Sequence, residues 1–359
     1  MKNYIDPNSS KPAYLQLYER LRDDITSGAF AYGTKLPSKR LLAEETGVSV
    51  ITVEHSYAIL ADEGYIEARP RSGYFTIYRE RDFLSSAHVP TAPTRKIPAH
   101  HGKTEFPFSV LARTMRKVLT DYGQDILSKS PNHGCAELRG AIAAYLARSH
   151  GITVRPEQVI IGSGAEYLYT LIAQLLGKDH IFALEDPSYD KIRRVYQAGG
   201  VTCDLLKLGH DGIRSAELER TEATILHITP FNSYPSGITA TASKRKEYLL
   251  WAKKRQGYIV EDNYDSELTV STKQEDPLFS RDDTDCVLYL NTFSKTIAPS
   301  IRVGYMLLPE SLLARFEETL GFYSCTVPLF EQYVLAELIN SGDFERHINR
   351  VRRARRKEK

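Results

Sequence analysis

The stretch "LNTFSKTIAPSIRVGYMLLP", residues 290–309, places Lys295 among small and hydroxyl residues, with Arg302 seven positions later. The apolar runs "CVLYL" and "VGYMLL" on either side of it are typical of strands. A lysine between two strands is either a solvated surface charge or a group held in place for chemistry. The rest of the sequence decides between these two interpretations.

From about residue 105 onward, the chain alternates apolar runs with helical patterns. The runs "QVIIG", "HIFALE", "VTCDLL", "ATILHIT" and "YIVED" have the length and composition of buried strands, and "EYLYTLIAQLLG" has a helical period. This alternation predicts an α/β domain with a mostly parallel, doubly wound sheet. Ligands of such sheets bind beyond the carboxyl ends of the strands, so we seek candidate site residues there.

Three further motifs follow predicted strands. In "VIIGSGAEYLYT" a glycine turn leads from a strand into a helix, where Gly164 and the backbone amides of Ala165 and Glu166 could face an anion. "YIVEDNYDSE" places Asp262 and Tyr264 at a strand end, and "ALEDPSYDK" places Tyr189 after another strand. Each motif alone has a purely structural explanation, namely a tight turn, a capping carboxylate, or an aromatic ring packed on the sheet edge.

Together with Lys295, these motifs describe the chemistry of pyridoxal 5'-phosphate (PLP). This cofactor needs a lysine for a Schiff base, an acidic partner for its ring nitrogen and a cradle for its phosphate. Lys295, Asp262 and the glycine turn with Arg302 supply one of each, and the planar guanidinium suits a phosphate. Tyr264 could bond the ring hydroxyl oxygen, and Tyr189 could stack on the ring.

The motifs between residues 131 and 352 resemble the aminotransferase-like PLP domain (fold type I, aminotransferase class I/II), through "PNHGCAELRGAIAAYLARSHGI", "TPFNSYPSGIT", "EDNYDSE" and "NTFSKTIAPSIRVGY". The resemblance implies that Lys295 is the catalytic lysine that forms the Schiff base with PLP. The cofactor-binding residues that it implies are Lys295, Asp262, Tyr264, Arg302, Ser294, Gly164, Ala165, Tyr189 and Asn232. Asn232 and Tyr234 both stay open as the support of the ring hydroxyl, because Tyr234 precedes the proline where many aminotransferases have asparagine.

The first segment, residues 1–78, predicts a small DNA-binding fold. Ser38 can cap a helix that Gly47 ends, and Ser49 can cap the next helix, which gives a helix-turn-helix. The segment that follows, "YIEARPRSGYFTIY", predicts a β-hairpin, which would be the wing. The segment has nine Lys/Arg against ten Asp/Glu, so charge alone does not indicate DNA. A protein-interaction module is the alternative.

Placement of the cations favours DNA, because helix starts and wing tips are where phosphates are contacted. Residues 12–76 also resemble the GntR family of winged helix-turn-helix regulators, through "PAYLQLYERLRDDITSGAFAYGTKLPSKRLLAEETGVS" and "EGYIEARPRSGYF". The DNA-binding residues expected from placement and resemblance are Lys39, Arg40, Ser49, Val50, Thr52, His55, Arg69, Arg71 and Ser72. Val50 stands where the family usually has an arginine, which puts the base preference in doubt.

With both sets of motifs in one chain, the sequence resembles the MocR subfamily, in which a linker joins a GntR winged helix to an aminotransferase-like domain. We expect domains at residues 1–78 and 105–359, with residues 79–104, polar and proline-containing, as the linker. The family's C-terminal small domain is expected to be lacking. The substrate site would then be incomplete, and the expectation leans away from an enzyme.

Composition bounds the remaining possibilities. The net charge is +2, the four cysteines are scattered without a Cys-x-x-Cys pair, and no apolar stretch is long enough to span a bilayer. These features predict a cytoplasmic protein without a metal site or a membrane partner.

Three functional interpretations stay open. The first is a transcriptional regulator that binds double-stranded DNA, holds PLP and senses it or an amino compound. The second is a PLP-dependent aminotransferase with an accessory DNA-binding domain. The third is a DNA-binding protein on a degenerate, cofactor-free dimerisation scaffold. The MocR resemblance also implies a homodimer, with each winged helix packed on the partner's large domain.

Overall fold

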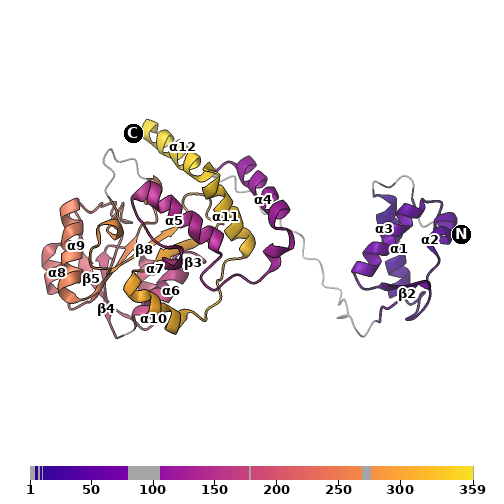
Figure 1. Cartoon of the computed structure of the whole chain (residues 1–359), viewed down its shortest axis with the longest axis horizontal. Coiled ribbons are helices and arrows are strands. Elements are labelled where there is room, and N and C mark those ends of the chain that lie inside the picture. The colour runs from indigo at the N-terminus through magenta and orange to yellow at the C-terminus, as the bar shows by residue number, and fades with distance from the viewer. Residues whose placement is uncertain are drawn as a thin grey trace. The chain divides into compact units, whose positions relative to one another are not determined.

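The computed structural model describes residues 5, 6, 9, 11–79, 106–177, 179–268 and 276–358. The predicted linker, residues 79–104, lies outside the described residues apart from Arg79. The chain divides into two compact units, Met1–Ala99 and His100–Lys359. Figure 1 shows the elements of each unit, which are described separately below.

The first unit is a winged helix-turn-helix, as predicted. Its elements are α1 (Ala13–Thr26), α2 (Lys39–Thr46), α3 (Val50–Asp62), β1 (Ile66–Arg69) and β2 (Gly73–Thr76). The side chains of Ser38 and Ser49 accept hydrogen bonds from the backbone amides of Leu41 and Thr52, so both predicted caps form. Gly47 ends α2 in the left-handed conformation with φ 71°. The antiparallel strands β1 and β2 make the wing.

A single apolar core fixes the orientation of α3 within this unit. Val53, Tyr57 and Leu60 of α3 are fully buried against Leu17 and Leu21 of α1. The opposite face of α3 is therefore left to solvent, which is the requirement for a helix that contacts another molecule.

The second unit is built on a seven-stranded sheet with the order β3-β9-β8-β7-β6-β4-β5. The strands are β3 (Val159–Gly162), β4 (Ile181–Asp186), β5 (Thr202–Lys207), β6 (Ile225–Ile228), β7 (Tyr258–Asp262), β8 (Val287–Thr292) and β9 (Gly304–Leu307). Strands β5, β4, β6, β7 and β8 run parallel, and β9 is antiparallel to both its neighbours. The predicted mostly parallel sheet is confirmed.

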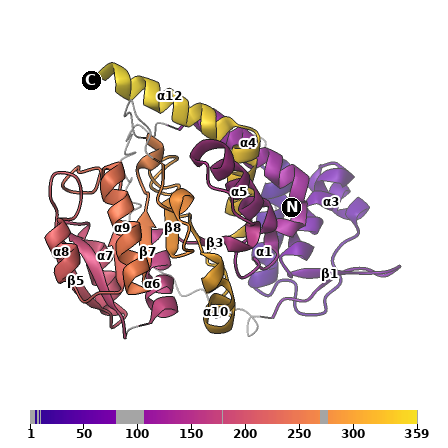
Figure 2. The ribbon, with the colours of Figure 1, turned by 60° about the vertical axis from the view of Figure 1, so that its left-hand side comes forward.

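Helices cover both faces of this sheet, and Figure 2 shows the sheet between them. They are α4 (Phe108–Tyr122), α5 (Ala136–His150), α6 (Ala165–Leu176), α7 (Asp190–Ala198), α8 (Ser215–Arg220), α9 (Ala242–Arg255), α10 (Glu310–Leu320), α11 (Leu329–Asn340) and α12 (Asp343–Glu358). Short 3-10 turns lie at Gly123–Leu127, Pro156–Gln158, Ser266–Leu268 and Phe279–Arg281.

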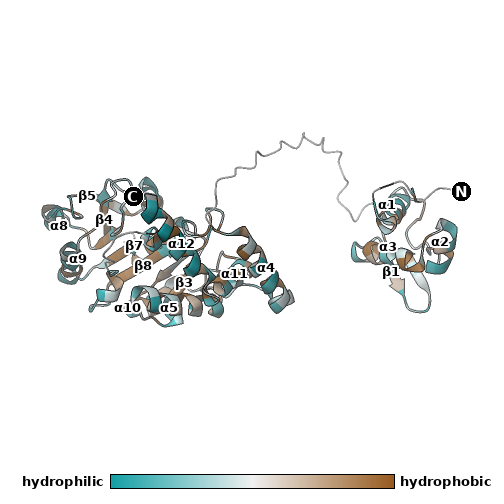
Figure 3. Ribbon diagram, turned by 90° about the horizontal axis from the view of Figure 1, so that it is seen from above, coloured by the Kyte–Doolittle hydropathy of each residue, from teal (hydrophilic) through white to brown (hydrophobic). Residues whose placement is uncertain are grey.

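Successive side chains of each strand point to opposite faces of the sheet, so they pack into two separate hydrophobic layers. On one face, Val260 and Leu288 join the cluster of α6, α7 and α10, while on the other Ile259 and Val287 join that of α8 and α9. Because both faces are covered, the central strands are apolar over most of their length, with polar residues toward their carboxyl ends, and Figure 3 shows β7 and β8 mostly in the hydrophobic colour.

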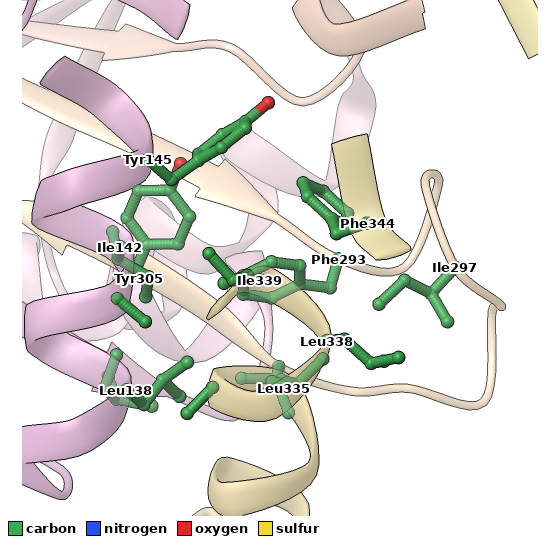
Figure 4. Packing of buried hydrophobic residues seen from close by; sticks show 14 of the residues in the cluster. Leu138, Ile142, Tyr145, Phe293, Ile297, Tyr305, Leu335, Leu338, Ile339 and Phe344 are labelled. Atoms are coloured by element: carbon green, nitrogen blue, oxygen red, sulfur yellow. The ribbon is translucent and has the colours of Figure 1, made fainter. Parts of the chain in front are cut away.

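The connection that carries Lys295 is anchored in a third cluster. Phe293 and Ile297 flank the lysine at two positions on either side, and both are buried among side chains of α5, α11 and α12. Figure 4 shows them beside Leu338 and Phe344. The turn after β8 is thus held by packing, which fixes the backbone at Lys295.

Candidate functional site

A cavity of about 290 Å³ opens in the second unit where β6, β7 and β8 end. Its lining residues are Ala165, Glu166, Tyr169, Tyr189, Ile192, Thr229, Tyr234, Asp262, Tyr264, Thr292, Ser294, Lys295 and Arg302. Seven of the nine predicted cofactor residues are in this lining. Gly164 is next to it at the start of α6, and Asn232 is not in the lining.

Lys295 reaches this cavity from the turn after β8. Its Nζ lies 5.1 Å from the centroid of the Tyr264 ring, so the amine and the phenol share one wall of the cavity. The hydroxyl of Tyr264 donates to the backbone oxygen of Asn232 at 3.2 Å. Burial raises the pKa of Tyr264 to about 12, with the nearby carboxylates of Asp265 and Asp262 adding to the effect. The phenol therefore stays protonated at neutral pH.

Asp262 ends β7 and is 2% exposed. The buried hydroxyl of Tyr169 donates to Oδ2 of Asp262, and Nε2 of His227 lies 3.8 Å from the same oxygen. Burial first, and then the charge of Asp262, raise the pKa of Tyr169 well above its usual value, so this hydroxyl remains a donor. Among the described residues, Oδ1 of Asp262 has no hydrogen-bond partner.

The turn from β3 into α6 forms the opposite end of the cavity. Gly164 has φ 94°, and a Cβ there would lie 3.0 Å from Nη2 of Arg302, so a side chain would crowd the guanidinium. Nη2 of Arg302 donates to Oε2 of Glu166 at 2.5 Å, and Lys191 approaches Oε1 of Glu166 at 3.2 Å. Ser294 donates its hydroxyl to the oxygen of Ile301 at 2.8 Å.

Glu166 is ionised in this setting. Partial burial alone would raise its pKa, but its backbone amide and the hydrogen bonds from Arg302 and Lys191 together lower it. A carboxylate therefore lies where the sequence predicts a phosphate cradle.

Two aromatic rings stand at the mouth of the cavity. Tyr189 and Tyr234 meet edge to face, with ring centroids 6.2 Å apart and an interplanar angle of 78°. Asn232 instead turns its amide to Oδ2 of Asp265 at 2.7 Å. Its contact with the cavity is thus indirect, through its backbone oxygen and Tyr264.

Several lining residues were not predicted from sequence, namely Tyr169, Ile192, Thr229 and Thr292. Tyr169 had a local signal, since it lies four residues after Ala165 and so on the same helical face. The backbone amide of Glu166 was a candidate anion contact at the start of this helix, but its carboxylate was not predicted to line the cavity. His227 had no local signal, because its neighbours Asp262 and Tyr196 are both more than 30 residues away in the sequence.

The first unit places the predicted DNA-binding residues on α2, α3 and the wing. Ser49 bonds Thr52 at the start of α3, with 2.9 Å between their hydroxyl oxygens, and the His55 ring lies against Tyr14. Val50 is 42% exposed, and Arg40 is also exposed. Lys39 is engaged by Glu54, since its Nζ donates to Oε1 at 2.5 Å.

The wing tip presents the other predicted residues. Arg71 is exposed and has φ 59°, a left-handed conformation in the turn between β1 and β2. The Ser72 amide donates to the oxygen of Arg69 at 3.0 Å and closes that turn. Arg69 lies over the Phe75 ring and pairs with Glu67, so it is partly engaged within the wing.

Comparison with known proteins finds a matching family for each of the two units. Residues 13–76 match the gntR family of bacterial regulatory proteins, and residues 100–359 match aminotransferase class I and II. The HTH-type regulator YdeL of Bacillus subtilis is 35% identical, over 97% of this chain and 78% of its own. The probable rhizopine catabolism regulatory protein MocR of Rhizobium meliloti is 29% identical, over 97% and 76%.

The chain belongs to the MocR subfamily of GntR-type regulators. This MocR-type protein is a transcriptional regulator with an aminotransferase-like domain. The HTH-type pyridoxine biosynthesis regulator PdxR of Corynebacterium glutamicum is a further relative, at 27% identity over 97% of this chain and 78% of its own.

Solved structures of aminotransferases share the fold of the second unit. An archaeal alanine:glyoxylate aminotransferase superposes with a TM-score of 0.63 at 24% identity, over 68% of this chain and 62% of that one. The multiple substrate aminotransferase of Thermococcus profundus gives a TM-score of 0.64 at 24% identity, over 69% and 64%. No helix in the described ranges has the length and apolar character to cross a membrane.

Proposed function

We propose that this MocR-type regulator binds PLP at Lys295 and that occupation of the site, by PLP or by an amino compound that reacts there, changes its binding to DNA. The observation that carries the proposal is that Lys295 and Asp262 both line one cavity. Asp262 is buried, is held by Tyr169, and keeps one oxygen without a partner among the described residues. The name of the relative PdxR, a regulator of pyridoxine biosynthesis, supports a vitamin B6 ligand.

The donor set fits this cofactor. The unpaired Oδ1 of Asp262 can accept the proton of the pyridinium nitrogen, and the phenol of Tyr264 can donate to the ring hydroxyl oxygen. Arg302, the turn at Gly164 and Ala165, and Ser294 would hold the phosphate, while Tyr189 would cover the ring. When bound, PLP supplies an electron sink for bonds at an amino carbon. Lys295 supplies the amine that bonds the aldehyde.

The test is covalent capture. The protein is incubated with PLP, reduced with borohydride, digested and analysed by mass spectrometry. We expect the phosphopyridoxyl adduct on Lys295 and no visible cofactor band in Lys295→Ala. The matched control is Lys191→Ala, which removes another exposed lysine near the cavity and should keep the adduct. An adduct spread over surface lysines, unchanged in Lys295→Ala, would refute the site.

Sensing is a separate claim and needs DNA. Affinity for an operator fragment is measured with and without PLP and with a panel of amines, for the wild type and for Lys295→Ala. We expect a ligand effect that depends on Lys295, because only a ligand with unequal affinity for two states shifts the equilibrium between them. An effect that persists in Lys295→Ala would place sensing elsewhere.

An aminotransferase is the second candidate, since the lysine, the ring-nitrogen partner and the stacking aromatic of that chemistry share the cavity. Within the described part of the chain, however, Lys295 and Arg302 are the only basic side chains of the lining. With Lys295 bonded to the cofactor and Arg302 on the phosphate, no second guanidinium in this lining would hold a substrate carboxylate. Conversion of the bound cofactor by amino acids, followed by keto-acid release, would favour the enzyme.

The arrangement of the protein in solution is also proposed here. We propose that residues 1–78 and 105–359 are its two domains. We also propose that the protein is a homodimer in which each winged helix packs on the large domain of the partner. Its location would be the cytoplasm, where a bacterial regulator binds DNA. Phe108 and Leu127 are 78% and 82% exposed, which is apolar surface that a partner copy could cover. Light scattering checks the dimer, and a monomeric mass at working concentration would contradict it.

A further inference from the structure

The exposed face of α3 has an unusual composition for a helix that contacts DNA. Its residues "VITVEHSYAILAD" include neither lysine nor arginine. Val53 and Tyr57 point into the core, so Val50, Ile51, Glu54 and His55 make up the exposed face of the first half of the helix. The side chains available to bases are therefore two β-branched apolar groups, a carboxylate and an imidazole.

The apolar pair is at the helix start. Ile51 is 71% exposed and Val50 42% exposed, although both side chains would gain free energy from burial. The helix-turn-helix geometry directs the N-terminal residues of the second helix to base edges in the major groove. Val50 and Ile51 begin α3, so they are the first residues of this helix expected to approach a base pair.

The charges around the pair match DNA. The positive end of α3 and the Ser49 cap precede Val50, and the exposed Arg40 and Arg71 stand on α2 and the wing. Nζ of Lys39 donates to Oε1 of Glu54 at 2.5 Å, so the lysine compensates the negative charge of the carboxylate next to the apolar side chains. Arg40 and Arg71 are therefore available to bind phosphates, while the start of α3 exposes the methyl groups of Val50 and Ile51.

We propose that Val50 and Ile51 read the 5-methyl groups of thymine, so that the operator has T·A pairs at the base steps that the start of α3 faces. This rests on the DNA binding proposed above. A thymine is distinguished in the major groove by its methyl group, which an aliphatic side chain can cover. A guanine at the same step would turn two acceptors toward Val50 and Ile51, and their desolvation would be uncompensated.

The first experiment selects sites from a random duplex pool with the full-length protein. We expect half-sites with thymine at one or two fixed positions. Each such thymine is then replaced by deoxyuridine, which removes only the methyl group. We expect about a fourfold loss of affinity for each methyl, the equivalent of about 0.8 kcal/mol for one buried carbon. Ile51→Ala or Val50→Ala should abolish the difference between thymine and deoxyuridine at one of these positions.

The converse experiment introduces an arginine at position 50. Val50→Arg should shift the selected base toward guanine, because a guanidinium bonds O6 and N7 of guanine in a bidentate manner. Both side chains are exposed, so these variants should fold, and circular dichroism checks this. Equal binding of thymine and deoxyuridine duplexes by the wild type would overturn the proposal. So would selected sites that place cytosine against Glu54 and lose it in Glu54→Gln.

A failure of the proposed function would look different. In that case the full-length protein would enrich no sequence and would bind duplex DNA with one affinity whatever the sequence. If Val50 and Ile51 instead cover a second copy of the chain, Ile51→Ser would change the mass in solution and leave the selected sequence unaltered.

Discussion

Nη2 of Arg302 lies 2.5 Å from Oε2 of Glu166, in the first turn of α6. The residue proposed to hold the cofactor phosphate is therefore already paired with a carboxylate, which also contacts Lys191. A phosphate that enters must share Arg302 with Glu166 or displace it. Both side chains are partly exposed, at 53% and 30%, so water screens this competition without removing it.

Replacement of Glu166 by glutamine should therefore strengthen PLP binding. We expect the dissociation constant to fall by about three- to tenfold, because a negative charge within a few ångströms of the phosphate is removed in a partly solvated site. Pyridoxal, which has no phosphate, is the control ligand and should bind both proteins alike. Spectral titration of both ligands gives the measurement. Equal strengthening for pyridoxal would show that Glu166 acts on the ring and not on the phosphate.

The second prediction concerns the hydrogen bond between Tyr169 and Asp262. Tyr169→Phe removes the hydroxyl that satisfies Oδ2 of a buried carboxylate. We expect the free energy of unfolding of the second unit to fall by about 1–3 kcal/mol, the usual cost of losing a hydrogen bond to a charged group. Denaturant unfolding measures it, and Tyr258→Phe on the partly exposed start of β7 is the matched control. A loss no larger than the control would mean that water replaces the hydroxyl.

The central strands of the second unit could be predicted because they are buried on both faces. Every residue from Val287 to Thr292 is buried, and such a strand must be apolar almost throughout. The serine caps were equally accessible, since Ser38 and Ser49 act on amides three residues away. Signals of this kind are local, and a single sequence contains them.

The surroundings of Asp262 could not be predicted in the same way. Tyr169 lies 93 positions from it in the sequence, and neither Tyr169 nor His227 differs by type from a core residue. The ion pair of Arg302 with Glu166 spans 136 positions. Such contacts depend on the register of helices against the sheet, which no periodicity specifies. The sequence therefore indicated candidate cofactor residues that line one cavity, but not the residues that contact them.

The third prediction is a dependence of stability on pH that comes from Glu185. This carboxyl at the end of β4 is 4% exposed and bonds the Ser233 hydroxyl at 2.6 Å, and burial raises its pKa to about 8. The folded protein therefore binds a proton that the unfolded chain releases near its ordinary pKa. Between about pH 4.5 and pH 8 this favours the folded state less as the pH rises.

Glu185→Gln keeps the shape and cannot ionise, so it should lose this dependence. We expect the wild type to fall in unfolding temperature relative to the variant between pH 5 and pH 8, with the difference levelling off at higher pH. The exposed Glu219→Gln is the control and should follow the wild type at every pH. Parallel curves for wild type and Glu185→Gln would show that Glu185 is ionised throughout.

The fourth prediction separates affinity for DNA from choice of sequence. Arg40 is exposed at the start of α2, where a phosphate contact is expected. Arg40→Gln should weaken binding to all duplexes by a similar factor and lower the slope of log K against log salt by about one, because one fewer counterion is released. The control is Arg20→Gln, at an exposed position of α1. Because α1 packs on the buried face of α3, opposite the face expected to contact DNA, this variant should keep the salt slope. If Arg40→Gln altered the selected sequence and left the salt slope intact, Arg40 would contact a base, and the division between phosphate-binding cations and base-reading apolar groups would be wrong.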